Sequence, residues 1–238
     1  MNTGIRLALA TLVLAGSAHA QKLASEFWAA TTTDGSAFGF AVALDGDRIL
    51  ATGDQVVTVF DLATGSELFD LVPSAGVTDD AFGARVAADG GFAVVGAPGD
   101  DHAGYGSGAA YVFDVTTGQE LFRLTASDAA QNDSFGISVA VGDGYVAVGA
   151  YLDDHVGGID SGSVYVYDLA TGQELYKLFT PTNGKGHHLG TSVSIAGGRL
   201  LAGAPLAYVK AGRAYVYDLG TGQQLLTLTA SDPEIAAA

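Results

Sequence analysis

The sequence predicts an all-β protein, a β-propeller of four-stranded antiparallel blades in which four repeats are visible. Three observations support this prediction. One multi-part pattern recurs four times along the chain, the strand-like segments are short and bounded by turn residues, and nothing after the first twenty residues has the periodicity of a helix. Four copies in register are hard to obtain by chance, so we expect one repetitive domain.

The first twenty residues are expected to be a secretory signal peptide. One basic residue, Arg6, precedes an apolar run from Leu7 to Ala15, and small residues follow, ending in Ala18-His19-Ala20. This order matches a basic region, a hydrophobic region and an A-x-A cleavage site, and the run is too short for a spanning helix. We therefore expect a secreted, periplasmic or cell-surface protein without membrane insertion. A buried N-terminal helix is the alternative.

The composition narrows the class of partner. The chain has 26 acidic and 10 basic side chains, and removal of the signal peptide takes away one of the basic ones and no acid. Such a field repels nucleic-acid phosphates and anionic lipids, which leaves cations, basic proteins and neutral glycans as partners. The chain has no cysteine, so its stability must come from packing instead of disulfides.

Each copy begins with an aromatic or leucine residue followed by glycine. These pairs are Phe38-Gly39, Phe82-Gly83, Phe135-Gly136 and Leu189-Gly190. In the second copy a small apolar stretch, Gly96-Ala97-Pro98, comes next, then an alternating strand, Tyr111-Val112-Phe113-Asp114, a turn at Thr117-Gly118 and a closing strand, Glu120 to Leu124. The expected blades are residues 38–72, 82–125, 135–179 and 189–228.

The third copy illustrates the four expected strands, at residues 135–141, 145–150, 163–168 and 173–179. The first opens with Phe135, whose following glycine allows close approach of a neighbouring blade. The second is made of small residues, which suit converging backbones, and the third is apolar on both faces, so both faces must be covered. A radial stack of blades meets these demands. The residues that open each copy are therefore expected to be structural core: Phe38, Phe82, Phe135 and Leu189.

The segments outside the four copies carry parts of further ones. Residues 21–37 form a leading strand and linker, in which Glu26 to Thr31 resembles a closing strand, and the tail at residues 229–238 begins like the linker Thr125 to Asp128. Seventeen strands result. Most propellers have more than four blades, so we expect an incomplete or truncated ring. A compact four-bladed ring is the alternative.

The order FG, then V-x-V-G-A-P, then S-G-x-A-Y-V-F-D resembles the FG-GAP repeat, the blade of integrin α-subunit propellers and of many secreted bacterial proteins. The resemblance extends from Phe38 to about Leu228 and implies a propeller with adhesion-like roles. The family's calcium sites lie in an acidic loop between the first two strands of a blade. Here those connections are tight hairpin turns, such as Asp89-Gly90-Gly91, which cannot supply six to eight oxygen ligands. The calcium role is therefore not carried over.

Long polar loops are expected on one rim of the propeller, where second strands connect to third strands and each blade connects to the next. Binding residues usually lie on such loops, held by a rigid scaffold. The candidate binding residues on this rim are Asp79, Asp80, Asp100, Asp101, His102, Asp128, Asp133, Asp153, Asp154, His155, Asp160, His187 and His188.

An Asp-Asp-His sequence occurs twice on this rim, at residues 100–102 and 153–155. Two carboxylates and an imidazole in a glycine-rich loop could hold a divalent cation. The candidate ligands are Asp100, Asp101, Asp153, Asp154 and Asp160. Adjacent carboxylates in extended backbone point in opposite directions, so an ordinary solvated loop is the alternative. No other cofactor is expected.

The sequence contains no G-x-S-x-G elbow, H-E-x-x-H helix, P-loop or cysteine nucleophile. We therefore expect a non-enzymatic module that binds an extracellular protein or glycan through the acidic rim. One alternative is a quinoprotein-like enzyme, because residues 164–175 also resemble blades of pyrroloquinoline quinone dehydrogenases. Those blades end this segment in Trp, where this chain has Phe69, Phe122, Tyr176 and Leu226. A purely structural repeat of a cell-envelope protein is the other alternative.

Overall fold

The computed structural model describes residues 37–53, 55–74, 76, 80–155, 158–180, 184–207 and 211–230. The expected signal peptide, the expected strand at residues 26–31, Asp79 and residues 231–238 lie outside these ranges. The described residues form sixteen strands in four separate sheets, and in every sheet four consecutive strands pair in sequence order. Each sheet is one blade of the predicted type.

The blades are numbered 1 to 4 along the chain. Blade 1 contains β1 (Val42–Asp45), β2 (Arg48–Gly53), β3 (Val56–Asp61) and β4 (Glu67–Leu71). Blade 2 contains β5 (Arg85–Asp89), β6 (Phe92–Ala97), β7 (Ala109–Asp114) and β8 (Glu120–Leu124). Blade 3 contains β9 (Ser138–Gly142), β10 (Tyr145–Ala150), β11 (Ser163–Asp168) and β12 (Glu174–Leu178). Blade 4 contains β13 (Ser192–Ala196), β14 (Arg199–Ala204), β15 (Arg213–Asp218) and β16 (Gln224–Leu228).

The first strand of each blade begins later than predicted. In blade 3 it starts at Ser138 instead of Phe135, because Gly136 has a φ of 94° and the N–H of Ile137 donates to the carbonyl of Ser134. The Phe-Gly pair is therefore a turn before the strand. The turns between first and second strands are the predicted tight hairpins, with left-handed φ at Gly90 and Gly91 in blade 2.

The acid before each Thr-Gly turn closes that turn. Asp114 Oδ1 accepts hydrogen bonds from the backbone N–H of Thr116 at 2.7 Å and of Thr117 at 3.0 Å. The amide hydrogen bonds recur at Asp61, Asp168 and Asp218. In all four blades the pairing of third and fourth strands also shifts register at one equivalent position. The four repeats are therefore equivalent in detail.

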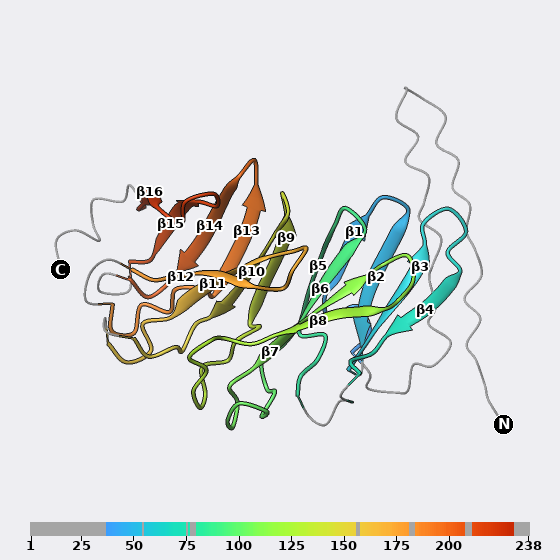
Figure 1. The fold of residues 1–238 in the computed structure, drawn as a ribbon, viewed down its shortest axis with the longest axis horizontal. Helices are drawn as coiled ribbons and strands as arrows, with labels where there is room; N and C mark the ends of the chain where they lie inside the picture. Colours follow the sequence, from blue (N-terminus) through green and yellow to red (C-terminus); the bar gives the residue numbers. More distant parts are fainter. Residues whose placement is uncertain are drawn as a thin grey trace.

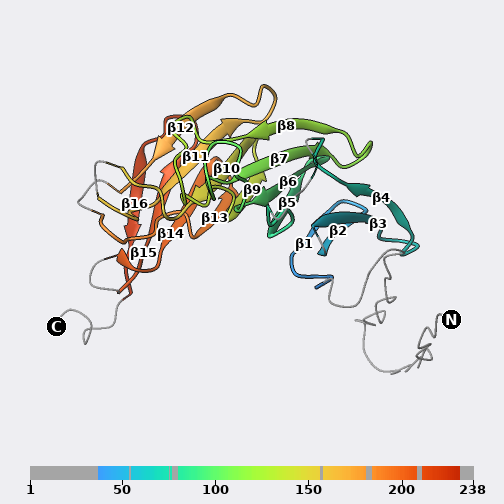
Figure 2. The same cartoon turned by 90° about the horizontal axis from the view of Figure 1, so that it is seen from below.

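The four blades form an open arc, with blade 1 and blade 4 at opposite ends (Figures 1 and 2). The backbones of neighbouring blades lie closest at their innermost strands, β1 against β5, β5 against β9 and β9 against β13. Each junction encloses a hydrophobic core. One blade contributes its second to fourth strands, and the next contributes its second and third strands with the Phe or Leu of its Phe-Gly or Leu-Gly pair. The fold is the predicted propeller-blade fold, arranged as an arc among the described residues.

Three of the four expected core residues are buried: Phe82, Phe135 and Leu189 expose 3%, 0% and 0% of their surfaces. Phe135 packs edge-on against Tyr165 and Tyr167. Phe38 is 36% exposed, so the prediction that it is a core residue was wrong. The reason is its position at the open end of the arc, where no described blade precedes it.

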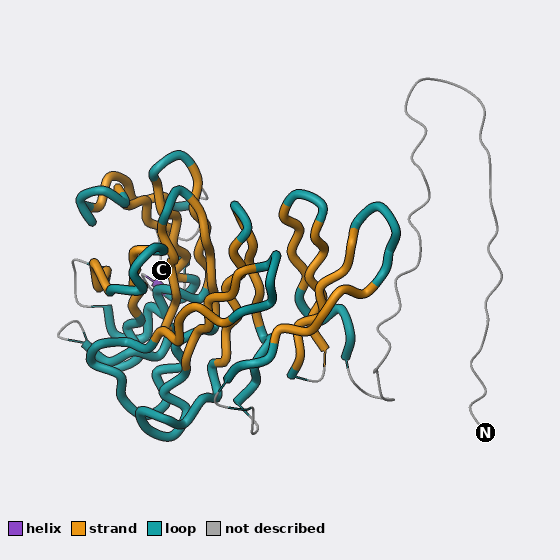
Figure 3. Tube along the Cα trace, turned by 45° about the vertical axis from the view of Figure 1, so that its right-hand side comes forward, coloured by secondary structure: helices purple, strands orange, loops and turns teal. Residues whose placement is uncertain are grey.

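The loops that follow second and fourth strands gather on one side of the arc (Figure 3). This arrangement places the two Asp-Asp-His sequences and the connections between blades on the same rim, as the alternating strand directions require. No helix in the described part of the chain is long and apolar enough to cross a membrane.

Candidate functional site

The first aspartate of the Asp-Asp-His sequence in blade 2 is a buried member of an ion pair. Asp100 has no exposed surface, and its Oδ1 lies 2.6 Å from Nη2 of Arg123 on β8. Its Oδ2 accepts a hydrogen bond of 3.0 Å from the hydroxyl of Tyr111 on β7. Burial alone would raise the pKa of Asp100, but the N–H of His102, Tyr111 and Arg123 outweigh burial and lower it. Asp100 is therefore charged and already paired within the protein.

Blade 3 repeats this network with lysine in place of arginine. Asp153 is 2% exposed, and its Oδ2 lies 2.9 Å from Nζ of Lys177 on β12. The hydroxyl of Ser163 donates to the same carboxylate at 2.6 Å, and the hydroxyl of Tyr165 lies 3.1 Å from its Oδ1. Lys177 also pairs with Asp128, on the loop that enters blade 3, at 2.6 Å. The network thus ties together both loops that form the rim at this blade.

The second aspartate of each sequence is exposed and binds a different partner from the first. Asp101 Oδ1 accepts a hydrogen bond of 2.6 Å from the backbone N–H of Gly106, and Asp154 Oδ1 accepts one of 2.7 Å from the N–H of Asp160. Each closes its own loop. No three of the five predicted metal ligands, all of which are described, lie close enough together to hold one ion, and the buried member of each pair already contacts a cationic side chain.

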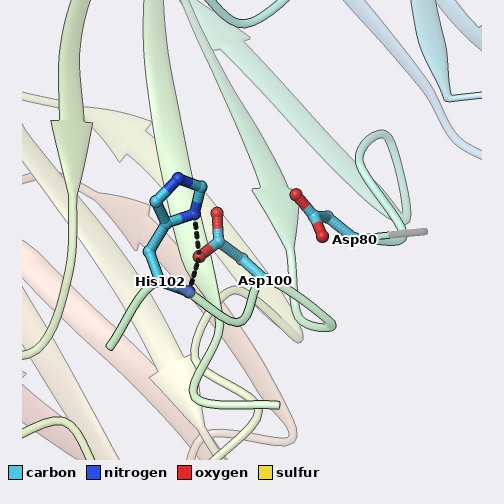
Figure 4. A group of neighbouring side chains, drawn as sticks. All are labelled: Asp80, Asp100 and His102. Atoms are coloured by element: carbon cyan, nitrogen blue, oxygen red, sulfur yellow. Dashed lines mark hydrogen bonds and ion pairs between the residues drawn. The ribbon is translucent and has the colours of Figure 1, made fainter. Parts of the chain in front are cut away.

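A different group of three, Asp80, Asp100 and His102, brings one ligand atom from each residue within 4.8 Å of the others. Figure 4 shows both the ring nitrogen and the backbone N–H of His102 bonded to Asp100, with Asp80 opposite. Asp80 and Asp100 are buried, whereas the His102 side chain is 51% exposed. Arg123 already lies against the Asp100 carboxylate, so a divalent cation here would have to compete with a resident positive charge.

Asp133 occupies in blade 3 the place that Asp80 has in blade 2, two residues before the Phe-Gly pair. It is 3% exposed and accepts a hydrogen bond of 2.7 Å from the backbone N–H of Ala130. Burial, together with the smaller effect of the Asp153 charge, raises the pKa of Asp133 to about 6. The pKa of His155 is lowered, mainly by burial. Asp133 therefore titrates in the mildly acidic range.

The two remaining candidates, His187 and His188, lie on the loop that enters blade 4. His187 is 8% exposed, and burial lowers its pKa. His188 packs edge-on against Tyr151, with ring centroids 5.3 Å apart. The loop after β14 has Ala207 where the other two blades have Asp100 and Asp153, so no equivalent ion pair forms there.

The cationic members of the networks, Arg123 and Lys177, were not among the predicted site residues, and neither were Tyr111 and Tyr165. A signal for them was present in the sequence. Arg123 and Lys177 each stand between apolar residues of a closing strand, and a cationic residue occurs at this position only in the two blades that carry Asp-Asp-His. The other two blades have Asp70 and Thr227 at that position.

The exposed surface of this rim combines charged and apolar side chains. Asp101, Asp154 and Asp128 carry its exposed negative charge. Tyr105 is 71% exposed and Ile159 is 57% exposed on the same loops. Such a mixture on adjacent rigid loops is typical of recognition surfaces. From here on, the name acidic rim refers to these five exposed residues.

Comparison with known proteins supports the repeat. Residues 66–113 and 119–167 match the model of the FG-GAP repeat. Each match begins next to the last strand of one blade and ends in the third strand of the next, so it spans one blade junction. No curated protein sequence matches the chain.

The solved structures that resemble the chain include Kuenenia stuttgartiensis hydrazine synthase, with a TM-score of 0.54 and 13% sequence identity. The match covers 85% of this chain and 51% of that one, so the chain spans about half the length of its structural neighbour. At this identity the likeness concerns the fold alone.

Proposed function

Since the chain carries FG-GAP repeats folded as propeller blades, we propose that it is a secreted, non-enzymatic module that binds an extracellular protein or glycan through its acidic rim. The observation that carries the proposal is the duplicated ion pair, Asp100 with Arg123 and Asp153 with Lys177. Each pair anchors a long loop to its own blade and leaves the next residue, Asp101 or Asp154, in solvent.

The rigidity of the loops supports a binding role. A loop that is already held by buried hydrogen bonds loses little conformational freedom when it binds a partner. The side chains of Asp101 and Asp154 are themselves held by backbone N–H groups. Two equivalent acidic positions on neighbouring blades thus form a pre-organised negative pattern.

The charge of the rim favours a partner with a basic surface. The whole chain has a net charge of −16, and a cationic protein surface would be steered toward such a field. The exposed ring of Tyr105 would also suit stacking on a sugar. A neutral glycan is therefore the second ligand class, and the two classes differ in salt dependence.

The test compares charge removal on the two rims. The double variant Asp101→Asn/Asp154→Asn removes two rim charges but keeps both acceptor oxygens. The matched control, Asp89→Asn/Asp143→Asn, removes two exposed charges from the opposite rim, and Asn tolerates the left-handed φ of 53° at position 143. We expect the rim variant to weaken binding of a lysine-rich peptide about tenfold at low salt, and the control to change it less than about twofold.

The same proteins would be tested against a panel of neutral oligosaccharides. Binding that is insensitive to salt and lost on substitution of Tyr105 by Ala would identify a glycan ligand. Equal loss of peptide binding in both double variants would contradict the proposal, because it would mean that net charge acts without a defined rim.

A further inference from the structure

Each blade has two sheet faces, which we call front and back. The front face contacts the preceding blade and the back face contacts the following one. At the junction of blades 2 and 3, for example, Val112 and Leu124 on the back of blade 2 pack with Phe135 and Tyr165 on the front of blade 3. The junctions before and after it are built in the same way.

The back face of blade 4 has the same apolar character but nothing in the described chain covers it. Leu228 is 47% exposed, whereas its equivalents Leu71, Leu124 and Leu178 are at most 7% exposed. Leu201 is 41% exposed, whereas its equivalent in blade 3, Ala147, is fully buried. Positions that are buried at the junctions between blades are therefore exposed on the back face of blade 4.

One aromatic contact recurs at every junction. The ring of Phe69, Phe122 or Tyr176 on the fourth strand lies against the Thr-Gly turn of the next blade, so closely that a Cβ on Gly118, Gly172 or Gly222 would come within 3.0 Å of it. In blade 4 this position is Leu226, which is 56% exposed. The corresponding turn of blade 1 contains Gly65, which no preceding described blade contacts.

The innermost strand on the front of blade 1 is open as well. Val42 and Leu44 are 65% and 60% exposed, whereas Val141, the equivalent of Leu44 in blade 3, is 8% exposed. The outer part of the same face, at Thr58 and Phe60, is already buried. The free surface is thus the innermost strand, the part where the backbones of neighbouring blades lie closest.

We propose that these two open faces bind each other in a second copy of the chain, with the back of blade 4 in each copy packed on the front of blade 1 in the other. The back face of a blade meets the front face of the next at all three junctions within the chain, so the contact, made at the part of the blade 1 face that is still free, continues an established interface. Two such contacts close a ring of eight blades, which lies within the range of four to eight that propellers adopt.

The free part of the front face of blade 1 is its innermost strand, so the paired copies would meet there, where the backbones of neighbouring blades lie closest within the chain. Head-to-tail packing keeps the strand direction unchanged around the ring. Both acidic rims would then lie on one side of the ring, although the proposed pairing does not depend on what they bind.

The test measures the mass of the full chain by light scattering over a range of concentrations. We expect twice the chain mass, with Leu226→Lys weakening association at least tenfold. The matched control is Leu225→Lys. Leu225 is 45% exposed, but its equivalents Leu68, Leu121 and Leu175 stay 36–41% exposed within the arc, so this position lies outside the contact. Circular dichroism would verify that both variants fold.

A mixing experiment distinguishes the proposed contact from other modes of association. Val42→Lys should also weaken self-association, because it alters the opposite face. A mixture of the Leu226→Lys and Val42→Lys proteins regains one unaltered contact and should form pairs more readily than either protein alone. A monomer at all concentrations, equal effects at positions 225 and 226, a mass that grows without limit, or no effect of Val42→Lys would each overturn the proposal.

Discussion

Blades 3 and 4 have the same strands, the same turns and the same shift of register, but they differ at two places. Blade 3 carries the buried pair of Asp153 and Lys177, where blade 4 has Ala207 and Thr227. The back face of blade 3 is sealed by blade 4, whereas Leu226 and Leu228 on the back of blade 4 are exposed. The shared strands, turns and register shift are therefore what the blade fold requires. The charged rim loops of blade 3 and the exposed back face of blade 4 are features of individual blades.

The largest effect is expected from the aromatic residue that opens each blade. Phe135→Ala removes a fully buried ring from the junction of blades 2 and 3 and should lower the free energy of unfolding by about 3–5 kcal/mol. The same change at Phe38, which is 36% exposed, should cost about 1 kcal/mol. Denaturant unfolding measures both. Equal losses of stability would show that Phe38 is as well packed as Phe135, which would contradict the exposure of blade 1 at its front face.

The buried ion pair is the next test. Lys177→Met leaves the carboxylate of Asp153 buried without its cation and should destabilise the protein by about 3 kcal/mol. The double variant Lys177→Met/Asp153→Asn should be more stable than Lys177→Met alone, because the uncompensated charge is gone. Additive losses in this cycle would contradict the account of the rim loops.

A smaller loss of stability is expected where the backbones of neighbouring blades approach closely. A Cβ on Gly149 would lie within 2.5 Å of the Gly190 carbonyl oxygen in the next blade, so Gly149→Ala should cost about 1–3 kcal/mol. The equivalent Gly203 in blade 4 faces only the flexible side chain of Ser192. Gly203→Ala should therefore leave the unfolding of the single chain nearly unchanged, as measured at low protein concentration. A large loss at Gly203 would indicate an unrecognised neighbour.

The smallest expected effect is the pH dependence from Asp133. Its pKa of about 6 lies above the ordinary value of 3.8, so its protonated form stabilises the fold. That contribution is complete below pH 3.8 and is lost as the pH rises through 6. Asp133→Asn should thus gain about 1–3 kcal/mol relative to the parent at pH 7 and little at pH 4. The difference between the two proteins isolates Asp133 from Asp128, Asp153, His155 and Lys177, which face it in both. A constant difference across this range would refute the assignment.

The fold could be predicted because all four repeats carry the same sequence pattern. Small residues on second strands and two-sided apolar third strands require covered faces wherever they occur, as residues 145–150 and 163–168 illustrate. The start of the first strand was missed by three residues in blade 3, since the turn at Gly136 depends on tertiary close packing. Periodicity alone does not carry that information.

The rim was predicted in position but not in detail. The sequence places Asp100 and Asp101 side by side, yet one is buried and the other exposed, because Arg123 arrives from a strand more than twenty residues away. Local patterns could not reveal this partner. The restriction of Arg123 and Lys177 to the two blades with Asp-Asp-His was the available clue.

The central claim is that the back face of a blade is buried at each of the three junctions and exposed on blade 4. The chain has no cysteine, so single substitutions Leu178→Cys and Leu228→Cys place a thiol at equivalent positions of blades 3 and 4. In dilute folded protein, a thiol reagent should label position 228 rapidly and leave position 178 protected, while at high concentration position 228 should become protected too. Equal labelling at the two positions in dilute protein would contradict the account.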